Sequence, residues 1–331
     1  MIENGGYSSQ ANIRKKGKKM EKTTKQKKLS KFNKGDLIFY CLVLAWPVLQ
    51  FCIFYVGVNL NSVLMSFKKI TIGQNGEWAS TPTFAQYQAA FKWLLGHDFW
   101  QYMGVSLKAF AITTGIGLPL GLLFAYYIFK KLPAWGAFRV ILYLPQILSG
   151  VVVAAIFQYF LIDCLPYMAP SIGNLLDKTR GTRFAVLMFF NIWISFGVNV
   201  LMYSNKMSGI SDEIIESAHL DGATGLKEFW YIVLPLTYST ISVFLITGIA
   251  GICINQYGVY DMFKGRAEAN ETTIGYWFFV SVASRFQQMT DPNGAATLPY
   301  YSAIGVLLTV FTVPIALTIR WALEKFGPSE D

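Results

Sequence analysis

Long apolar runs alternate with shorter polar segments along most of the chain. Six runs are long enough to cross a bilayer as helices, at about 1.5 Å of rise per residue. They lie at Leu37–Val58, Val105–Phe129, Val140–Ile162, Phe184–Tyr203, Ile232–Ile254 and Tyr301–Trp321. The runs are continuously apolar rather than alternating, which excludes a transmembrane strand barrel. The pattern therefore predicts an all-α polytopic membrane protein with six transmembrane helices.

The segments between the runs differ in length and character. Residues 68–101 are polar and aromatic, and residues 163–183 contain two prolines, so both are expected to be loops. Residues 255–299 form a longer loop with one apolar helix candidate, Thr273–Phe286. Pro119 lies inside the second run, where a kink is expected.

Charge is concentrated at the start of the chain. The 331 residues carry a formal net charge of +9, and Lys and Arg crowd residues 1–35, where few residues are apolar. This tail cannot bury a core, so we expect it to be disordered and to keep the N-terminus in the cytoplasm. A contact with anionic membrane lipid is the alternative role. Residues 36–331 then form the membrane domain, and because the basic excess is local, no nucleic-acid partner is expected.

Candidate catalytic or metal-binding chemistry is scarce. The cysteines share no metal-ligand spacing, and neither His97 nor His219 forms a motif with a cysteine or carboxylate. We therefore expect no enzyme activity, metal or cofactor. No G-x-x-x-x-G-K-[ST] phosphate-binding loop occurs, so the chain should not bind ATP by itself.

One charged segment, residues 211–235, lies between the fourth and fifth runs. Ser211 can cap a helix whose first turn holds two acids, which the helix dipole favours. Gly222 is placed to end that helix, and Pro235 stands where the next apolar segment begins. The pattern predicts a short amphipathic helix at the membrane face that docks on a partner. An ordinary surface helix in a cytoplasmic loop is the alternative.

The amino-acid sequence of this segment resembles a known family signature. Glu216-Ser217-Ala218, then Gly222, then Ile232-Val233-Leu234-Pro235 resembles the E-A-A-x3-G-x9-I-x-L-P signature of permease subunits of bacterial ABC importers. Ser217 is the one departure, since the family usually has Ala there. The resemblance implies that this segment is the coupling helix that docks on the ATPase. The residues that it implies for this role are Glu216, Ser217, Ala218, Asp221, Gly222, Ala223, Leu234 and Pro235.

Three further stretches look like the carbohydrate-type, six-span permeases, so that the resemblance covers about residues 100–325. They are Tyr143–Pro145 with Val151–Phe157, Asn255–Tyr260, and Tyr301–Gly305. The resemblance implies import of a sugar or oligosaccharide across the bacterial cytoplasmic membrane. It implies as partners a cytoplasmic ABC ATPase dimer, an extracytoplasmic solute-binding protein and a second permease subunit, as a heterodimer. A non-sugar solute, such as a polyol or glycerol phosphate, is the alternative substrate.

A polar stripe inside the fourth run is the first candidate for the substrate pathway. Its members are spaced four apart, so they share one face of a helix. They are Asn191, Ser195, Asn199 and Tyr203, and the next candidates are Asn255, Gln256 and Tyr257. The stripe either lines the pathway or supplies hydrogen bonds between helices. No acidic pair or arginine ladder lies inside the runs, which argues against a secondary transporter. A non-transporting membrane scaffold is a further alternative.

Overall fold

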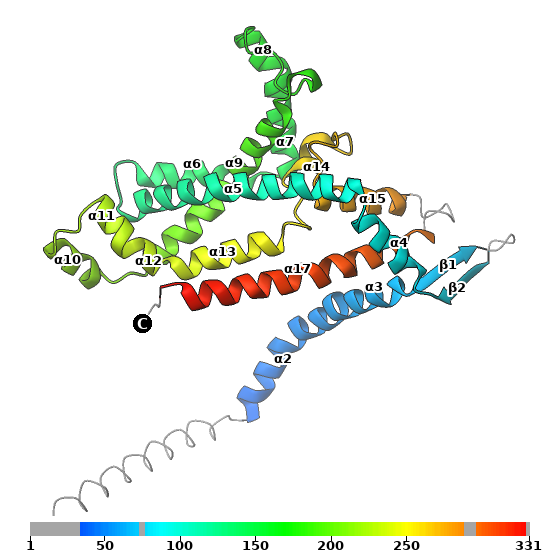
Figure 1. The fold of residues 1–331 in the computed structure, drawn as a ribbon. Helices are drawn as coiled ribbons and strands as arrows, with labels where there is room; N and C mark the ends of the chain where they lie inside the picture. Colours follow the sequence, from blue (N-terminus) through cyan, green and yellow to red (C-terminus); the bar gives the residue numbers. More distant parts are fainter. Residues whose placement is uncertain (1–33, 73–76, 288–295, 329–331) are drawn as a thin grey trace, which may run out of the picture. The chain divides into compact units, whose positions relative to one another are not determined.

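The computed structural model describes residues 34–72, 77–287 and 296–328 (Figure 1). The predicted tail therefore lies almost entirely outside the described residues. The chain divides into two compact units, with the boundary in the sequence between Ser62 and Val63. The first unit is one apolar helical run, in which a π-helical segment joins two α-helices. These are α2 (Lys34–Gln50), η1 (Phe51–Gly57) and α3 (Val58–Ser66), whose last turn belongs to the second unit. The first predicted span lies within this run.

The second unit begins with ordered elements where a loop was predicted. Strands β1 (Lys68–Ile72) and β2 (Trp78–Pro82) pair antiparallel, and helix α4 (Ala85–Leu94) follows. The loop prediction was wrong because both signals are short: two alternating isoleucines in β1, and Ala90 and Leu94 on one buried face of α4. The second span also begins earlier than predicted, at His97 instead of Val105.

Four helices of the second unit run side by side (Figure 1). They are α5 (His97–Phe129), α9 (Arg183–Met207), α13 (Tyr238–Ala250) and α17 (Leu298–Phe326). Helix α5 packs against α9 and α13, and α13 packs against α17. Buried Gly121 of α5 lies against the Tyr203 ring of α9, so the missing side chain lets the two helices approach closely.

The third predicted span, Val140–Ile162, is not one continuous helix. It is divided into α6 (Trp135–Ile147) and α7 (Gly150–Tyr159), and the second part continues through η2 (Phe160–Cys164) and α8 (Leu165–Met168). Leu148 and Ser149 between the two helices are extended. Pro145 contributes to the break because it lacks the N–H that would bond one turn back.

The fifth predicted span, Ile232–Ile254, is bent and displaced. A helical run of α11 (Leu226–Glu228), η4 (Phe229–Val233) and α12 (Leu234–Leu236) meets α13 at an angle of 65°. Pro235 therefore lies inside this run rather than at its start. A π-helical segment and a proline directly before the bend are recognised causes of such a kink. The run ends at Ala250, short of Ile254.

The described helices otherwise match the predicted order. Five of them are long and apolar enough to cross a membrane, and the bent pair counts as a sixth. The all-α polytopic prediction is thus confirmed. Helix α10 (Asp212–Leu220) and α11 lie at one end of the second unit, whereas α14 (Val259–Phe263) and α15 (Ile274–Gln287) lie toward the other (Figure 1). Helix α15 confirms the predicted helix at Thr273–Phe286.

Candidate functional site

The short helix predicted in the charged segment is present and has a defined end. Ser211 is extended and its carbonyl accepts the amide of Ile214 at 3.2 Å, although its hydroxyl makes no capping bond. At the other end Gly222 has φ +79°, the left-handed conformation that glycine adopts without strain. The amides of Gly222 and Ala223 donate to the carbonyls of His219 and Ala218 at 3.0 and 2.8 Å. This is the Schellman arrangement, so α10 ends as predicted.

The two faces of α10 have different surroundings. Ala218 is buried and Ile215 is half-buried against the helices of the second unit, so this face holds α10 on its own chain. Ala218 therefore does not offer its side chain to a partner. The opposite face is open, with Glu216, Ser217 and Asp221 exposed beside Leu220, which is 90% exposed. An exposed leucine among acidic and small residues is suited to docking in a groove.

The other predicted coupling residues follow α10 along the chain. Gly222 is exposed and Ala223 is half-buried in the turn. Leu234 and Pro235 are half-buried in the bent fifth span, and Leu234 packs against the same apolar cluster as Ile215 of the inner face of α10. These two residues therefore shape the helix that follows the docking segment rather than the docking surface.

A buried carboxylate beside α10 escaped the sequence analysis. Glu228 of α11 has a fully buried side chain, and Lys130 at the end of α5 places its Nζ 3.0 Å from both carboxylate oxygens. His219 of α10 places Nε2 2.7 Å from Oε2 of the same carboxylate. The Tyr126 hydroxyl, also on α5, donates to the Gly225 carbonyl at 2.9 Å. These contacts join α10, α11 and α5.

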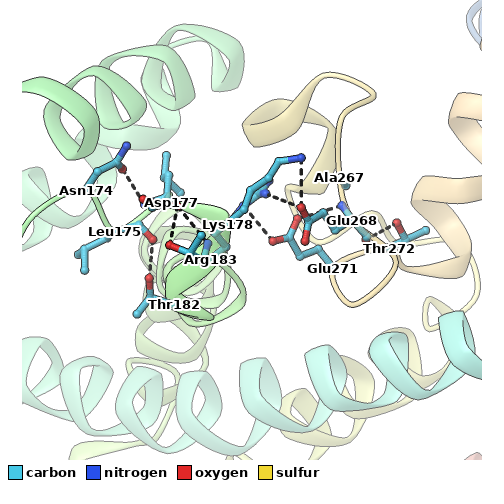
Figure 2. A network of polar contacts seen from close by, with 12 residues as sticks. Asn174, Leu175, Asp177, Lys178, Thr182, Arg183, Ala267, Glu268, Glu271 and Thr272 are labelled. Atoms are coloured by element: carbon cyan, nitrogen blue, oxygen red, sulfur yellow. Dashed lines mark hydrogen bonds and ion pairs between the residues drawn. The ribbon is translucent and has the colours of Figure 1, made fainter.

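A second polar network lies at the other end of the bundle (Figure 2). Arg183, the first residue of α9, is buried, and its Nε lies 3.0 Å from Oε1 of buried Glu271. Its Nη1 lies 3.6 Å from Glu268, and Lys178 contacts the same Glu268 oxygen at 3.1 Å. The Arg183 guanidinium also lies 4.4 Å from the centre of the Phe263 ring. The network therefore fastens residues 174–183 to residues 263–272.

Local hydrogen bonds order residues 174–183 of this network. The Asp177 carboxylate accepts from the Thr179 amide at 3.0 Å, and Thr182 donates to the Leu175 carbonyl at 2.6 Å (Figure 2). Burial raises the pKa of Glu271, and the hydrogen bond from the Glu268 amide and the nearby Arg183 charge oppose this shift only in part. Both contacts therefore favour the ionised form of this buried carboxylate.

The predicted polar stripe of α9 faces its neighbouring helices. The Ser195 hydroxyl donates to the Asn191 carbonyl of its own helix at 2.7 Å, and Asn191 lies beside Gly258. Tyr203 is 2% exposed and packs against Phe244, so it belongs to the core. Asn199 is half-buried beside α5, and the described residues offer its side chain no hydrogen bond. These contacts indicate that Tyr203 packs in the core. A role for Asn199 in the substrate pathway stays a prediction.

The three candidates after the fifth span lie in a turn. The Asn255 side chain accepts the Tyr257 amide at 2.8 Å, and Tyr257 is buried with φ +51°. Gln256 is half-buried. Asn255 and Tyr257 thus shape the turn that leads to α14, and their predicted contact with substrate stays a prediction.

A cavity of about 510 Å³ lies between α13 and α17. It is lined on α13 by Ser239, Ser242 and Thr247, and on α17 by Arg320 and Glu324. The Ser242 hydroxyl is buried there without a hydrogen-bond partner within the described part of the chain. The sequence analysis missed this polar face because its hydroxyl groups are small and sit in a strongly apolar run.

The sequence matches a family and several characterised relatives. Residues 117–329 match the family described as binding-protein-dependent transport system inner membrane component. The chain is 25% identical over 289 residues to the arabinooligosaccharides transport system permease protein AraP of Bacillus subtilis, covering 82% of this chain and 83% of that one. It is 28% identical over 165 residues to the multiple sugar-binding transport system permease protein MsmF of Streptococcus mutans, covering 48% and 56%.

The fold also matches a solved structure. A chain of a bacterial alginate ABC transporter, in complex with an alginate pentasaccharide-bound periplasmic protein, superposes with a TM-score of 0.64. The match covers 88% of this chain and 96% of that chain, at 19% sequence identity. At this identity the likeness establishes the fold.

Proposed function

The chain belongs to the family of binding-protein-dependent transport system inner membrane components, and from this premise we propose that it carries a sugar or oligosaccharide through the bacterial inner membrane. It is the multi-pass permease subunit of an ABC importer, a transport subunit rather than an enzyme. The names of AraP and MsmF support a sugar over a polyol or glycerol phosphate. The solved neighbour, which holds an oligosaccharide-loaded periplasmic protein, agrees with this choice.

The geometry of helix α10 is the main observation that supports a coupling role. It is a short helix with a buried inner face and an open outer face, at the end of the bundle where α5 and α9 finish. We assign its outer face, with Glu216, Ser217 and Asp221, to the cytoplasmic ATPase dimer. The end of the bundle that carries α10 is then cytoplasmic, and so is the N-terminus.

The opposite end of the bundle then faces the extracytoplasmic side. There the network of Arg183 with Glu268 and Glu271 holds two loops together, and we assign this surface to the solute-binding protein. A second permease subunit, as a heterodimer, and membrane lipid complete the surroundings of the apolar helices.

A matched pair of tryptophan variants tests the ATPase contact. Ser217→Trp adds a large ring to the open face of α10, whereas Ser171→Trp adds it to an exposed position in the loop between α8 and α9. We expect the ATPase to co-purify with the Ser171 variant and to be lost from the Ser217 variant. Normal co-purification and uptake in the Ser217 variant would refute the coupling role.

Uptake measurements test the substrate class. Vesicles that contain the permease with its ATPase and binding protein should accumulate radiolabelled arabino-oligosaccharides but neither glycerol 3-phosphate nor a polyol. Accumulation of only the latter compounds would overturn the sugar assignment while leaving the family intact.

The side of the membrane on which the N-terminus lies needs its own test. A reporter protein that is active only in the cytoplasm should be active when it is fused to the N-terminus.

A further inference from the structure

Glu228 joins three elements through one buried carboxylate. Its side chain is fully buried, whereas the side chains of Lys130 and His219 are 28% and 42% exposed. Lys130 approaches both oxygens at 3.0 Å, and His219 approaches one of them at 2.7 Å. A buried carboxylate is costly unless it is paired, so these contacts must be kept while the carboxylate stays buried.

The three partners lie on elements with different roles. His219 is in the last turn of α10, Lys130 directly follows α5, and Glu228 ends α11 immediately before the π-helical η4. A displacement of α10 that kept the His219 contact would therefore pull on Glu228. From there it would reach the 65° bend of the fifth span through η4, and the end of α5 through Lys130.

We propose that Glu228 is a positioning residue that transmits movement of α10 to α5 and to the bent fifth span. This inference rests on the proposed function, because α10 moves only if an ATPase pulls on it. The Tyr126 hydroxyl bond to the Gly225 carbonyl, at 2.9 Å, is a second tie between α5 and the same loop. Glu228 acts through these contacts and has no contact with substrate or nucleotide in this role.

A variant of the carboxylate separates transmission from simple stability. Glu228→Gln keeps the shape of the side chain but removes its charge, and Lys227→Gln is the matched control, since Lys227 is the exposed neighbour on α11. In vesicles with the ATPase and binding protein, the Glu228 variant should assemble and retain basal ATP hydrolysis. Its stimulation by ligand-loaded binding protein should fall at least about fivefold, the lower end of typical allosteric coupling. The control should behave as wild type.

A second variant covers the case in which Glu228→Gln fails to assemble. His219→Ala removes only the α10 contact and leaves the ion pair of Lys130 with Glu228, and its half-exposed position allows assembly. The same loss of stimulation, with the ATPase still bound, supports transmission. Wild-type stimulation and uptake in either assembled variant overturn it. If the wild-type complex itself shows no stimulation and no sugar uptake, the proposed function fails instead.

Discussion

Single glycines set how closely the helices of the bundle approach. A Cβ added at Gly197 of α9 would clash with the Leu142 carbonyl oxygen of α6, which is a backbone atom and cannot rotate away. Gly115 of α5 has open space at the same position. A residue without a side chain is therefore required at position 197 but not at position 115. Small residues at close helix contacts are typical of membrane proteins.

Gly197→Ala should consequently separate α6 from α9. Overpacking of this kind costs about 1–3 kcal/mol, so we expect a lower thermal unfolding midpoint and a lower yield of purified transporter. Gly115→Ala is the control and should be neutral or slightly stabilising, because alanine favours helix by up to about 1 kcal/mol. Equal midpoints for the two variants would contradict the close contact.

The buried pair of Arg183 and Glu271 gives a second prediction for single residues. Arg183→Met leaves Glu271 buried without its cation, and removing one partner of a buried pair costs about 3–5 kcal/mol. Lys178→Met removes a mostly exposed partner, for which about 1 kcal/mol or less is expected. Hydrogen exchange of residues 263–272 should therefore rise strongly only in the Arg183 variant.

A double variant checks the cause of that effect. Arg183→Met combined with Glu271→Leu leaves no unpaired charge, so exchange should return toward the wild-type rate. Persistent rapid exchange in the double variant would mean that the loop needs a further contact that this variant lacks, either that of Arg183 with the Phe263 ring or that of the Glu271 carboxylate with the Glu268 amide.

At the scale of elements, the fifth span is sharply bent whereas α17 is not, although both contain a proline. The fifth span bends at Thr237 after a π-helical segment and Pro235, whereas α17 continues through Pro314 as one helix. A proline alone is therefore insufficient for a sharp bend. The π-helical segment η4 just before Pro235 distinguishes the bent helix, since α17 has no such segment before Pro314.

Pro235→Ala tests this account, because alanine restores an N–H that can bond to the Tyr231 carbonyl. We expect a smaller bend and a longer distance between spin labels at Leu226 and Thr247, both of which are exposed. Pro314→Ala should leave that distance unchanged. If the distance in the Pro235 variant equals that of the wild type, the packing of the bundle, not the proline, maintains the bend.

The same contrast explains what the sequence could predict. Length and continuous apolarity are local signals, so six spans and α10 with its glycine end were foreseeable. The break between Ile147 and Gly150 depends on packing between helices, and the short strands β1 and β2 carry too few residues to reveal a pattern. The buried Glu228 was missed because it sits beside a lysine in a charged loop, and its partner Lys130 is 98 residues away.

At the scale of the whole molecule, the two ends of the second unit are organised differently. One end has α10 fastened by Glu228, and the other has two loops fastened by Arg183. Each end is held by ion pairs to a buried carboxylate, whereas the helices between them meet through apolar and small residues. Removing one partner of such a pair is costly, so these contacts keep each end attached to the helices of the bundle.

The route of the substrate between these ends gives the last prediction. Asn199 is half-buried and has no side-chain hydrogen bond within the described residues, whereas Tyr203, one turn further, is 2% exposed in the core. If Asn199 binds a substrate hydroxyl in the pathway, replacing it with an apolar residue leaves that hydroxyl buried without a hydrogen bond. Such a loss strongly disfavours binding. Asn199→Leu should therefore reduce uptake without removing the protein from the membrane, whereas Tyr203→Phe should leave uptake near the wild-type rate.

Cysteine labelling during turnover distinguishes this route from simple packing between helices. The background must lack the native cysteines, which are Cys41, Cys52, Cys164 and Cys253. With a membrane-impermeant thiol reagent, Asn199→Cys should be labelled and protected by substrate, because a pathway must admit water when it opens. Tyr203→Cys should stay unreactive, since its position is enclosed by Gly121 and Phe244. If Asn199→Cys also stays unreactive while transport continues, Asn199 packs between helices and the cavity between α13 and α17 becomes the place to test next.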